Sequence, residues 1–176
     1  MPLDGRLRIT DVDLSDLKFA NDPDIDLSPL GLEKGDLLFV RTNGSRDLIG
    51  RVASVHGAEG MAFASYLIRV RVNPEYSPDF LSYYLNSVHG RKWIASVVSQ
   101  QVGQANVNGT KLKAPEIPNP PLADQTRIVA EVERRLSVVE ELDAVVSANL
   151  QRATRLRQAI LQKAFSGELL SHQGVQ

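Results

Sequence analysis

Residues 122–165 read LADQTRIVAEVERRLSVVEELDAVVSANLQRATRLRQAILQKAF and contain neither glycine nor proline. Apolar side chains recur in this segment at intervals of three or four, which is the period of an α-helix with one apolar face. The recurring residues are Val132, Leu136, Val139, Leu142, Val146, Leu150, Ala153, Leu156, Ile160 and Ala164. At about 1.5 Å per residue, one helix over the whole segment would be about 65 Å long. That exceeds the diameter of a domain built from the rest of the chain, so much of the helix is expected to protrude and to need a partner.

The residues around this segment define the ends of the predicted helix. Three prolines precede it and disfavour helix upstream, and Asp124 falls in the first turn, where the helix dipole favours a negative charge. Gly167 is placed to cap the C-terminus. The expected division is therefore a globular domain over residues 1–117, a proline joint over 118–121, the helix over 122–167 and a flexible tail over 168–176.

The two halves of the predicted helix carry different charges. Residues 122–143 contain six acidic and three basic residues, whereas residues 144–164 contain four basic residues and no acidic ones. A parallel copy would set like charges beside each other, while an antiparallel copy pairs each half with its opposite. We predict antiparallel pairing with a second copy or a partner helix, through Val132, Leu136, Val139, Leu142, Val146, Leu150, Leu156 and Ile160. The alternative is a helix that folds back on its own domain.

Composition limits the classes to which the protein can belong. The 176 residues are 43% hydrophobic and 23% charged, which is ordinary for a globular protein that buries a core. No window of the sequence has the pattern of a membrane span or a signal peptide, so a cytoplasmic protein is expected. The chain has no cysteine, which excludes disulfides and thiolate zinc sites, and its three histidines are too scattered to predict a metal site.

The net charge of −1 is unevenly distributed along the chain. Residues 1–33 carry eight acidic and three basic residues, whereas residues 34–121 carry ten basic and six acidic residues. The middle of the chain is therefore the part expected to meet a polyanion.

Before the long helix, the chain shows signals for a small α+β domain. Two β-prone runs, residues 36–41 and 48–55, flank the turn pair Asn43-Gly44 and predict a hairpin with a polar, cationic tip. A third strand is expected over residues 61–72. Ser77-Pro78-Asp79 predicts a capped helix that runs to about Ser87, and a second helix is expected over 91–99. Residues 99–110, with three glutamines and two asparagines, are expected to form a polar loop.

The hairpin tip and the glutamine-rich segment together hold the side chains that a DNA-reading surface needs. Glutamine and asparagine amides can read adenine bidentately, and arginine has the fork geometry for guanine or phosphate. The predicted DNA-facing residues are Arg41, Thr42, Asn43, Ser45, Arg46, Arg51, Gln100, Gln101, Gln104, Lys111 and Lys113. The alternative is a pair of solvated loops that are polar only because turns favour such residues.

Signals for catalysis are weak by comparison. The sequence has no glycine-rich phosphate loop and no serine in an elbow motif, so a non-catalytic protein is predicted. Residues 119–122, Asn-Pro-Pro-Leu, resemble the Asn-Pro-Pro-Tyr motif of adenine-N6 methyltransferases. That motif needs an aromatic residue in the fourth place to stack on a flipped base, and this segment is therefore interpreted as the proline turn into the helix.

Five further stretches form a pattern: GDLLFVRTNGS at 35–45, GQANVNGTKLK at 103–113, IPNPPLADQTRIV at 117–129, RLRQAIL at 155–161 and KAFSGEL at 163–169. In their order and spacing they resemble the specificity subunit of type I restriction-modification enzymes. Members of that family usually hold two target recognition domains, each followed by a long conserved helix. This chain has one of each, so it looks like a half-subunit or a C-terminal fragment.

The resemblance carries specific expectations about function. It implies that the domain reads one half of a bipartite double-stranded DNA site, that paired helices set the gap between the halves, and that modification and restriction subunits dock on this scaffold. It implies no cofactor for this chain, whereas the partner subunits would use S-adenosylmethionine, ATP and Mg. The competing interpretations are a protein-binding adaptor that dimerises through its helix, and an orphan nuclease or methylase.

Overall fold

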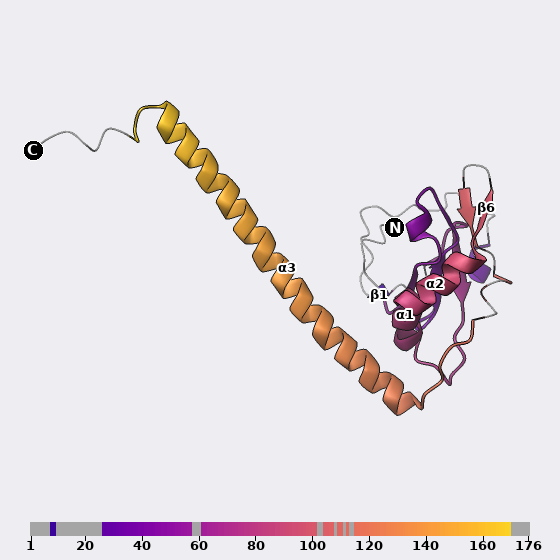
Figure 1. Ribbon diagram of the computed structural model, residues 1–176. Helices are drawn as coiled ribbons and strands as arrows, with labels where there is room; N and C mark the ends of the chain where they lie inside the picture. Colours follow the sequence, from indigo (N-terminus) through magenta and orange to yellow (C-terminus); the bar gives the residue numbers. More distant parts are fainter. Residues whose placement is uncertain are drawn as a thin grey trace, which may run out of the picture. The chain divides into compact units, whose positions relative to one another are not determined.

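The computed structural model describes residues 8–9, 26–57, 61–101, 104–107, 109–110, 112 and 115–169 (Figure 1). The chain divides into two units, Met1–Val129 and Ala130–Gln176. The first unit holds both sheets and the first two turns of the long helix, and the second holds the rest of that helix.

A four-stranded sheet forms the centre of the first unit. Its strands are β1 (Arg8–Ile9), β2 (Leu37–Val40), β4 (Val52–Val55) and β5 (Leu67–Val70), in the order β1-β4-β2-β5. Strand β2 pairs antiparallel with β4 and with β5, and β1 pairs parallel with β4. The predicted hairpin is therefore confirmed. The third predicted strand is shorter than residues 61–72, because a turn at Ser65-Tyr66 precedes β5.

Both faces of this sheet are buried, and β2 shows why. All four of its residues, Leu-Leu-Phe-Val, are buried, as is typical of a strand covered on both sides. Alternate residues enter different apolar clusters. Leu38 and Val40 pack with residues that include Ile49 and Val107, whereas Leu37 and Phe39 pack with Phe80, Leu81, Leu85 and Val129.

Two helices follow the sheet, and serines start both of them. Helix α1 spans Pro78–Asn86, and the Ser77 hydroxyl accepts a hydrogen bond from the Phe80 amide at 3.4 Å, as predicted for this capping residue. Ser87 ends α1 and caps helix α2, Val88–Val97, by accepting from the Gly90 amide. The second helix thus begins earlier than the predicted residue 91, because Ser87 serves both helices.

A second, three-stranded sheet contains the segment that was expected to be a loop. Strand β3 (Thr42–Asn43) pairs antiparallel with β7 (Gln104–Asn106), which pairs antiparallel with β6 (Ser99–Gln101). The prediction of a polar loop over residues 99–110 was therefore wrong for the residues of β6 and β7, which form strands. Two short 3-10 helices, η2 (Ser28–Leu30) and η3 (Arg46–Leu48), complete the described elements of this unit.

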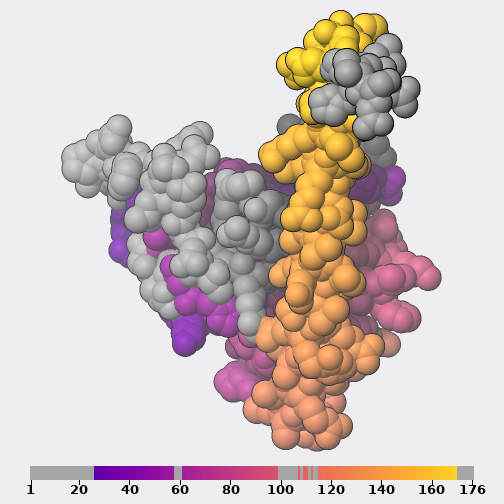
Figure 2. All heavy atoms as spheres, turned by 90° about the vertical axis from the view of Figure 1, so that its left-hand side faces the viewer, coloured from indigo at the N-terminus to yellow at the C-terminus, as the bar shows by residue number. Residues whose placement is uncertain are grey.

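Helix α3 spans Leu122–Phe165 without interruption, which confirms the long helix. Gly167 follows with a φ of 78°, a backbone conformation that favours glycine and ends the helix. Every residue from Arg134 to Phe165 is exposed, including apolar side chains such as Val146 at 64% and Leu150 at 68%. Figure 2 shows the atoms of this helix in orange to yellow. The expected fold class, a small α+β domain followed by one long helix, is confirmed.

One buried glutamine ties the start of α3 to the first unit. Gln125 is fully buried, and its Oε1 accepts a hydrogen bond from the Ser77 amide at 2.7 Å. Its Nε2 donates to the carbonyl oxygens of Glu75 and Pro120, both at 2.9 Å. The side chain therefore joins the helix start, the proline segment before it and the loop that leads into α1.

The described helices include none that is both long and apolar enough to cross a membrane.

Candidate nucleic-acid interface

The three-stranded sheet brings together the two polar segments that the sequence analysis had paired only by composition. Thr42 and Ser99 both lie opposite Asn106, and Asn43 and Gln100 both lie opposite Ala105. The pairing continues beyond β7, because the Val107 amide donates to the Arg41 carbonyl at 3.1 Å. Since Val107 is buried in the core, the strand is anchored where it leaves the sheet. The hairpin tip and the glutamine-rich segment thus form one hydrogen-bonded structure.

The predicted DNA-facing residues fall into three groups. On the hairpin tip, Arg41, Ser45 and Arg46 are exposed, while Thr42, Asn43 and Arg51 are half-buried. Gln100 and Gln101 lie on β6 and Gln104 lies on β7, where the backbone is described. Lys111 and Lys113 lie outside the described residues. Through Thr42 and Asn43 on β3, the structure joins the hairpin tip to the glutamine-rich strands in one sheet. Contact of any of these residues with DNA stays a prediction.

Asn43 has a local role in addition to its predicted one. Its Oδ1 accepts a hydrogen bond from the Ser45 amide at 2.8 Å, which fixes the turn that follows β3. This contact leaves the amide nitrogen of Asn43 as the part of the side chain that can donate to a ligand.

Arg91 is a cationic residue of this region that the sequence analysis missed. It lies in the first turn of α2, and its guanidinium donates to the Ile49 carbonyl at 2.8 Å and to the Asp47 carbonyl at 2.9 Å. Both acceptors belong to the turn that carries Arg46 and Arg51. No local sequence pattern pointed to Arg91, because the contact joins residues that are distant in the sequence.

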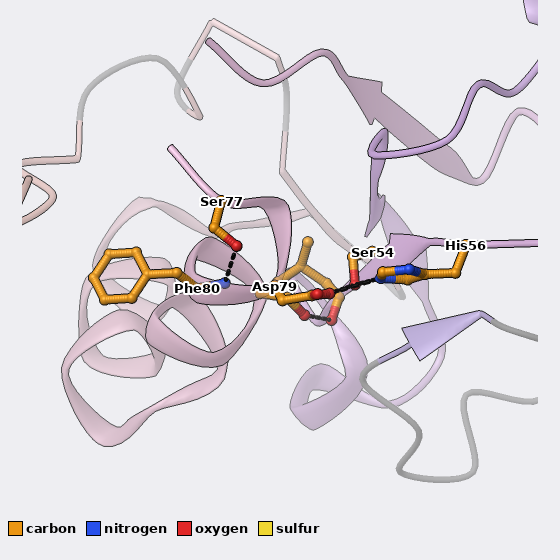
Figure 3. Close-up of polar contacts among 7 residues, drawn as sticks. Ser54, His56, Ser77, Asp79 and Phe80 are labelled. Carbon is orange, nitrogen blue, oxygen red and sulfur yellow. Dashed lines mark hydrogen bonds and ion pairs between the residues drawn. The ribbon is translucent and has the colours of Figure 1, made fainter. Parts of the chain in front are cut away.

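A Ser-His-Asp cluster lies on the first sheet, and its geometry excludes a nucleophilic triad (Figure 3). Ser54 Oγ donates to Asp79 Oδ1 at 2.6 Å, and His56 Nε2 lies 2.7 Å from the same oxygen. A triad needs the carboxylate on the ring nitrogen that faces away from the serine, and it needs an accessible hydroxyl. Here Asp79 contacts Nε2 of His56, the ring nitrogen that also lies near Ser54 Oγ. In addition, Ser54 is fully buried. The cluster instead joins strand β4 to the first turn of α1.

Across the part of the chain that the structure describes, no group of three His, Cys, Asp or Glu side chains is placed to hold a metal ion.

Comparison with known families identifies the chain. The family described as "Type I restriction modification DNA specificity domain" matches residues 32–140. This range includes every described strand except β1, together with α1, α2 and the start of α3. The chain belongs to this family. The resemblance noted in the sequence is thereby confirmed, and the specificity-domain match covers the tip, the glutamine-rich strands and Gln125 alike.

Relatives of this specificity domain carry related names. The chain is 30% identical over 165 residues to the type I restriction enzyme EcoKI specificity subunit of Escherichia coli strain K12, which covers 93% of this chain and 36% of that protein. It is 35% identical over 140 residues to the StySPI specificity subunit of Salmonella potsdam, covering 78% of this chain and 30% of the relative. The chain therefore spans about a third of the length of these curated relatives.

A solved structure has the same fold. The HsdS subunit from Thermoanaerobacter tengcongensis matches with a TM-score of 0.52 and 22% sequence identity, over 83% of this chain and 36% of that one. At this identity the likeness concerns the fold of the specificity domain and its helix.

Proposed function

We propose that this chain reads one half of a bipartite double-stranded DNA target as part of a type I restriction-modification specificity subunit, and that it catalyses no reaction itself. The observation that supports this most is the sheet β3-β7-β6, which joins a cationic tip to a glutamine-rich hairpin inside the family-matched segment. Amide and guanidinium side chains are residue types suited to base edges and phosphates. The relatives' names assign them the specificity role, not methylation or cleavage.

The proposed partners are the modification and restriction subunits of such a system. Methyl transfer with S-adenosylmethionine and cleavage driven by ATP with Mg would belong to those subunits, so this chain needs no cofactor of its own. Its part is to place them on DNA.

We further propose that α3 packs against a second copy in the antiparallel direction. Its interface residues Leu136, Val139, Leu142, Val146, Leu150, Leu156 and Ile160 are between 41% and 68% exposed, and so large an apolar face on one helix favours a partner. Charges select the direction. In the described helix, Glu140, Glu141 and Asp143 form no ion pair, and neither do Arg155 and Arg157. An antiparallel copy would bring these two groups together.

The basic residues in the first half of α3 are already used within the helix. Arg134 and Arg135 bind Glu131 at 2.9 Å and 2.7 Å. The hydrogen bond from Arg134, and after it the one from Arg135, lowers the pKa of the Glu131 carboxyl to about 2. Arg127 lies 3.6 Å from Asp124. These local pairs leave the unpaired acids at 140–143 as the charges that a second helix can meet.

The spacing of these apolar interface residues, here called the apolar stripe, defines one register for the antiparallel pair. When Asp143 faces Arg157 of the second copy, Val146 lies across from Leu156 and Leu142 across from Ile160, so apolar side chains oppose each other on both sides of the axis. The ion pair then occurs twice, once at each end of the contact.

Charge reversal at this pair tests the register. Asp143→Arg is expected to weaken self-association about tenfold, because two attractive pairs become repulsive. Adding Arg157→Asp to the same chain is expected to restore the association, since each reversed charge again meets its opposite. Sedimentation equilibrium would measure both constants. A double variant that associates no better than Asp143→Arg would argue against antiparallel pairing in this register.

Duplex binding tests the proposed DNA function. The chain, titrated into a labelled random-sequence duplex at several salt concentrations, is expected to bind with log K falling linearly against log salt. A protein-binding adaptor would leave the duplex unbound at every salt concentration, and that result would refute the proposal. The same chain incubated with DNA, S-adenosylmethionine and Mg should give no methylation and no cleavage. Turnover without partner subunits would favour an orphan methylase or nuclease.

A further inference from the structure

The turn after β3 is clamped by helix α2. Arg91 holds two carbonyl oxygens of this turn at once, those of Asp47 and Ile49, at 2.9 Å and 2.8 Å. The Nε of Arg51 donates to the same Asp47 carbonyl at 3.4 Å. Two guanidinium groups from different elements therefore meet at a single backbone oxygen.

Packing beneath the turn leaves it little freedom to move. Ile49 is fully buried, and Gly50 has a φ of 68°. A Cβ atom at Gly50 would come within 2.4 Å of the Ile94 side chain, so α2 lies directly against the backbone here. The turn that carries the arginines is therefore fixed by its contacts with the helix and is not a free loop.

The two arginines are held together without a carboxylate bound to either. Burial lowers the pKa of Arg91 first and the charge of Arg51 lowers it next, while Asp47 opposes the shift by a smaller amount. Among the described residues, no ion pair joins Arg46, Arg51 or Arg91 to an acidic side chain. Two neighbouring positive charges that repel each other are stabilised when an anion binds between them or beside them.

Arg91 and Arg51 differ in how many of their donor groups are used within the domain. Arg91 donates through both terminal nitrogens to carbonyl groups. Among the described residues, Arg51 donates only through Nε, so its terminal nitrogens can serve another acceptor. The turn is also continuous with β3, since only Gly44 and Ser45 separate Asn43 from Arg46. A phosphate bound at Arg51 would thus be held at a fixed place relative to the sheet β3-β7-β6.

We propose that Arg51 contacts a phosphate of the DNA backbone and that Arg91 is the positioning residue that holds Arg51 and its turn for this contact. The inference rests on the proposed DNA-reading function and deepens it, because it separates a backbone-holding turn from a base-reading sheet. Phosphate contacts set the register of a protein on the duplex, and base contacts supply sequence preference.

A double-mutant cycle with a random-sequence duplex tests the assignment. Arg51→Gln is expected to reduce the slope of log K against log salt by about 0.9, and to weaken binding about tenfold near 0.1 M salt, because one phosphate contact is lost. Arg91→Lys keeps the charge but cannot span two carbonyls, and it is expected to weaken binding to a similar extent. The double variant is expected to bind as Arg51→Gln does, because Arg91 acts through Arg51.

Controls separate this inference from folding and from the proposed function. Thermal unfolding of each variant shows whether the domain is intact, and Arg71→Gln, which removes a charge paired with Glu33 elsewhere on the domain, should bind like the unmodified chain. Additive losses from Arg51→Gln and Arg91→Lys, or an unchanged salt slope for Arg51→Gln, would overturn the inference while leaving DNA binding in place. Failure of the unmodified chain to bind any duplex would overturn both.

Discussion

If α3 pairs as proposed, replacing Val139 and Val146 together by aspartate is expected to separate the two copies into monomers. Both side chains lie on the apolar stripe and are 59% and 64% exposed in the single chain, so a monomer tolerates the change. In the proposed pair, Val146→Asp would bury a carboxylate opposite Leu156 of the other copy, twice in each dimer, and an unpaired buried charge costs several kcal/mol. The dissociation constant is expected to rise at least about a thousandfold.

The matched control places the same charges on the opposite side of the helix. Ala144 and Gln151 are exposed and lie away from the stripe, so Ala144→Asp with Gln151→Asp adds two acids without burying them. Light scattering should report a monomer for the stripe variant and an unchanged mass for the control. A stripe variant that keeps the mass of the unmodified chain would show that this face is not the interface.

Gln125→Met is expected to destabilise the first unit by about 3 to 5 kcal/mol. The new side chain has a similar shape, yet it leaves the Ser77 amide and the carbonyls of Glu75 and Pro120 without their partner. The three hydrogen bonds are part-buried, and each backbone group left unsatisfied there costs about 1 to 2 kcal/mol. Because Gln125 is fully buried, water cannot replace these contacts without opening the joint.

Thermal unfolding measures this effect. A loss of this size should lower the Tm of the first unit by more than about 10 °C. Gln151→Met makes the same chemical change at an exposed position of the same helix and should leave the Tm nearly unchanged. Equal Tm values for the two variants would mean that the hydrogen bonds of Gln125 do not stabilise the joint.

The features that the sequence predicted correctly are those set by local patterns. Helix α3 was expected over the same residues that form it, because the absence of glycine and proline and a long apolar period are local signals. The hairpin of β2 and β4 followed from two apolar runs around Asn43-Gly44. Ser77 was predicted as a cap because a capping serine acts on amides only a few residues away.

The features that the sequence did not predict depend on residues far apart in the chain. Strands β6 and β7 lack the alternation of apolar and polar residues that marks a strand, and β7 pairs with β3, which lies far earlier in the sequence. Arg91 appeared as an ordinary helix residue, since its acceptors Asp47 and Ile49 lie on another element. The candidate site could therefore be proposed by residue type, whereas its assembly into one sheet required the tertiary structure.

Sequence selection on DNA tests the central claim most directly. The chain would be incubated with a pool of randomised duplexes, and the bound fraction would be sequenced after several rounds. Two copies with antiparallel helices have two-fold symmetry, so the enriched duplexes are predicted to contain one short half-site twice, inverted, around a gap of constant length and random sequence. A bound pool with no enriched sequence would contradict the account that this chain reads DNA.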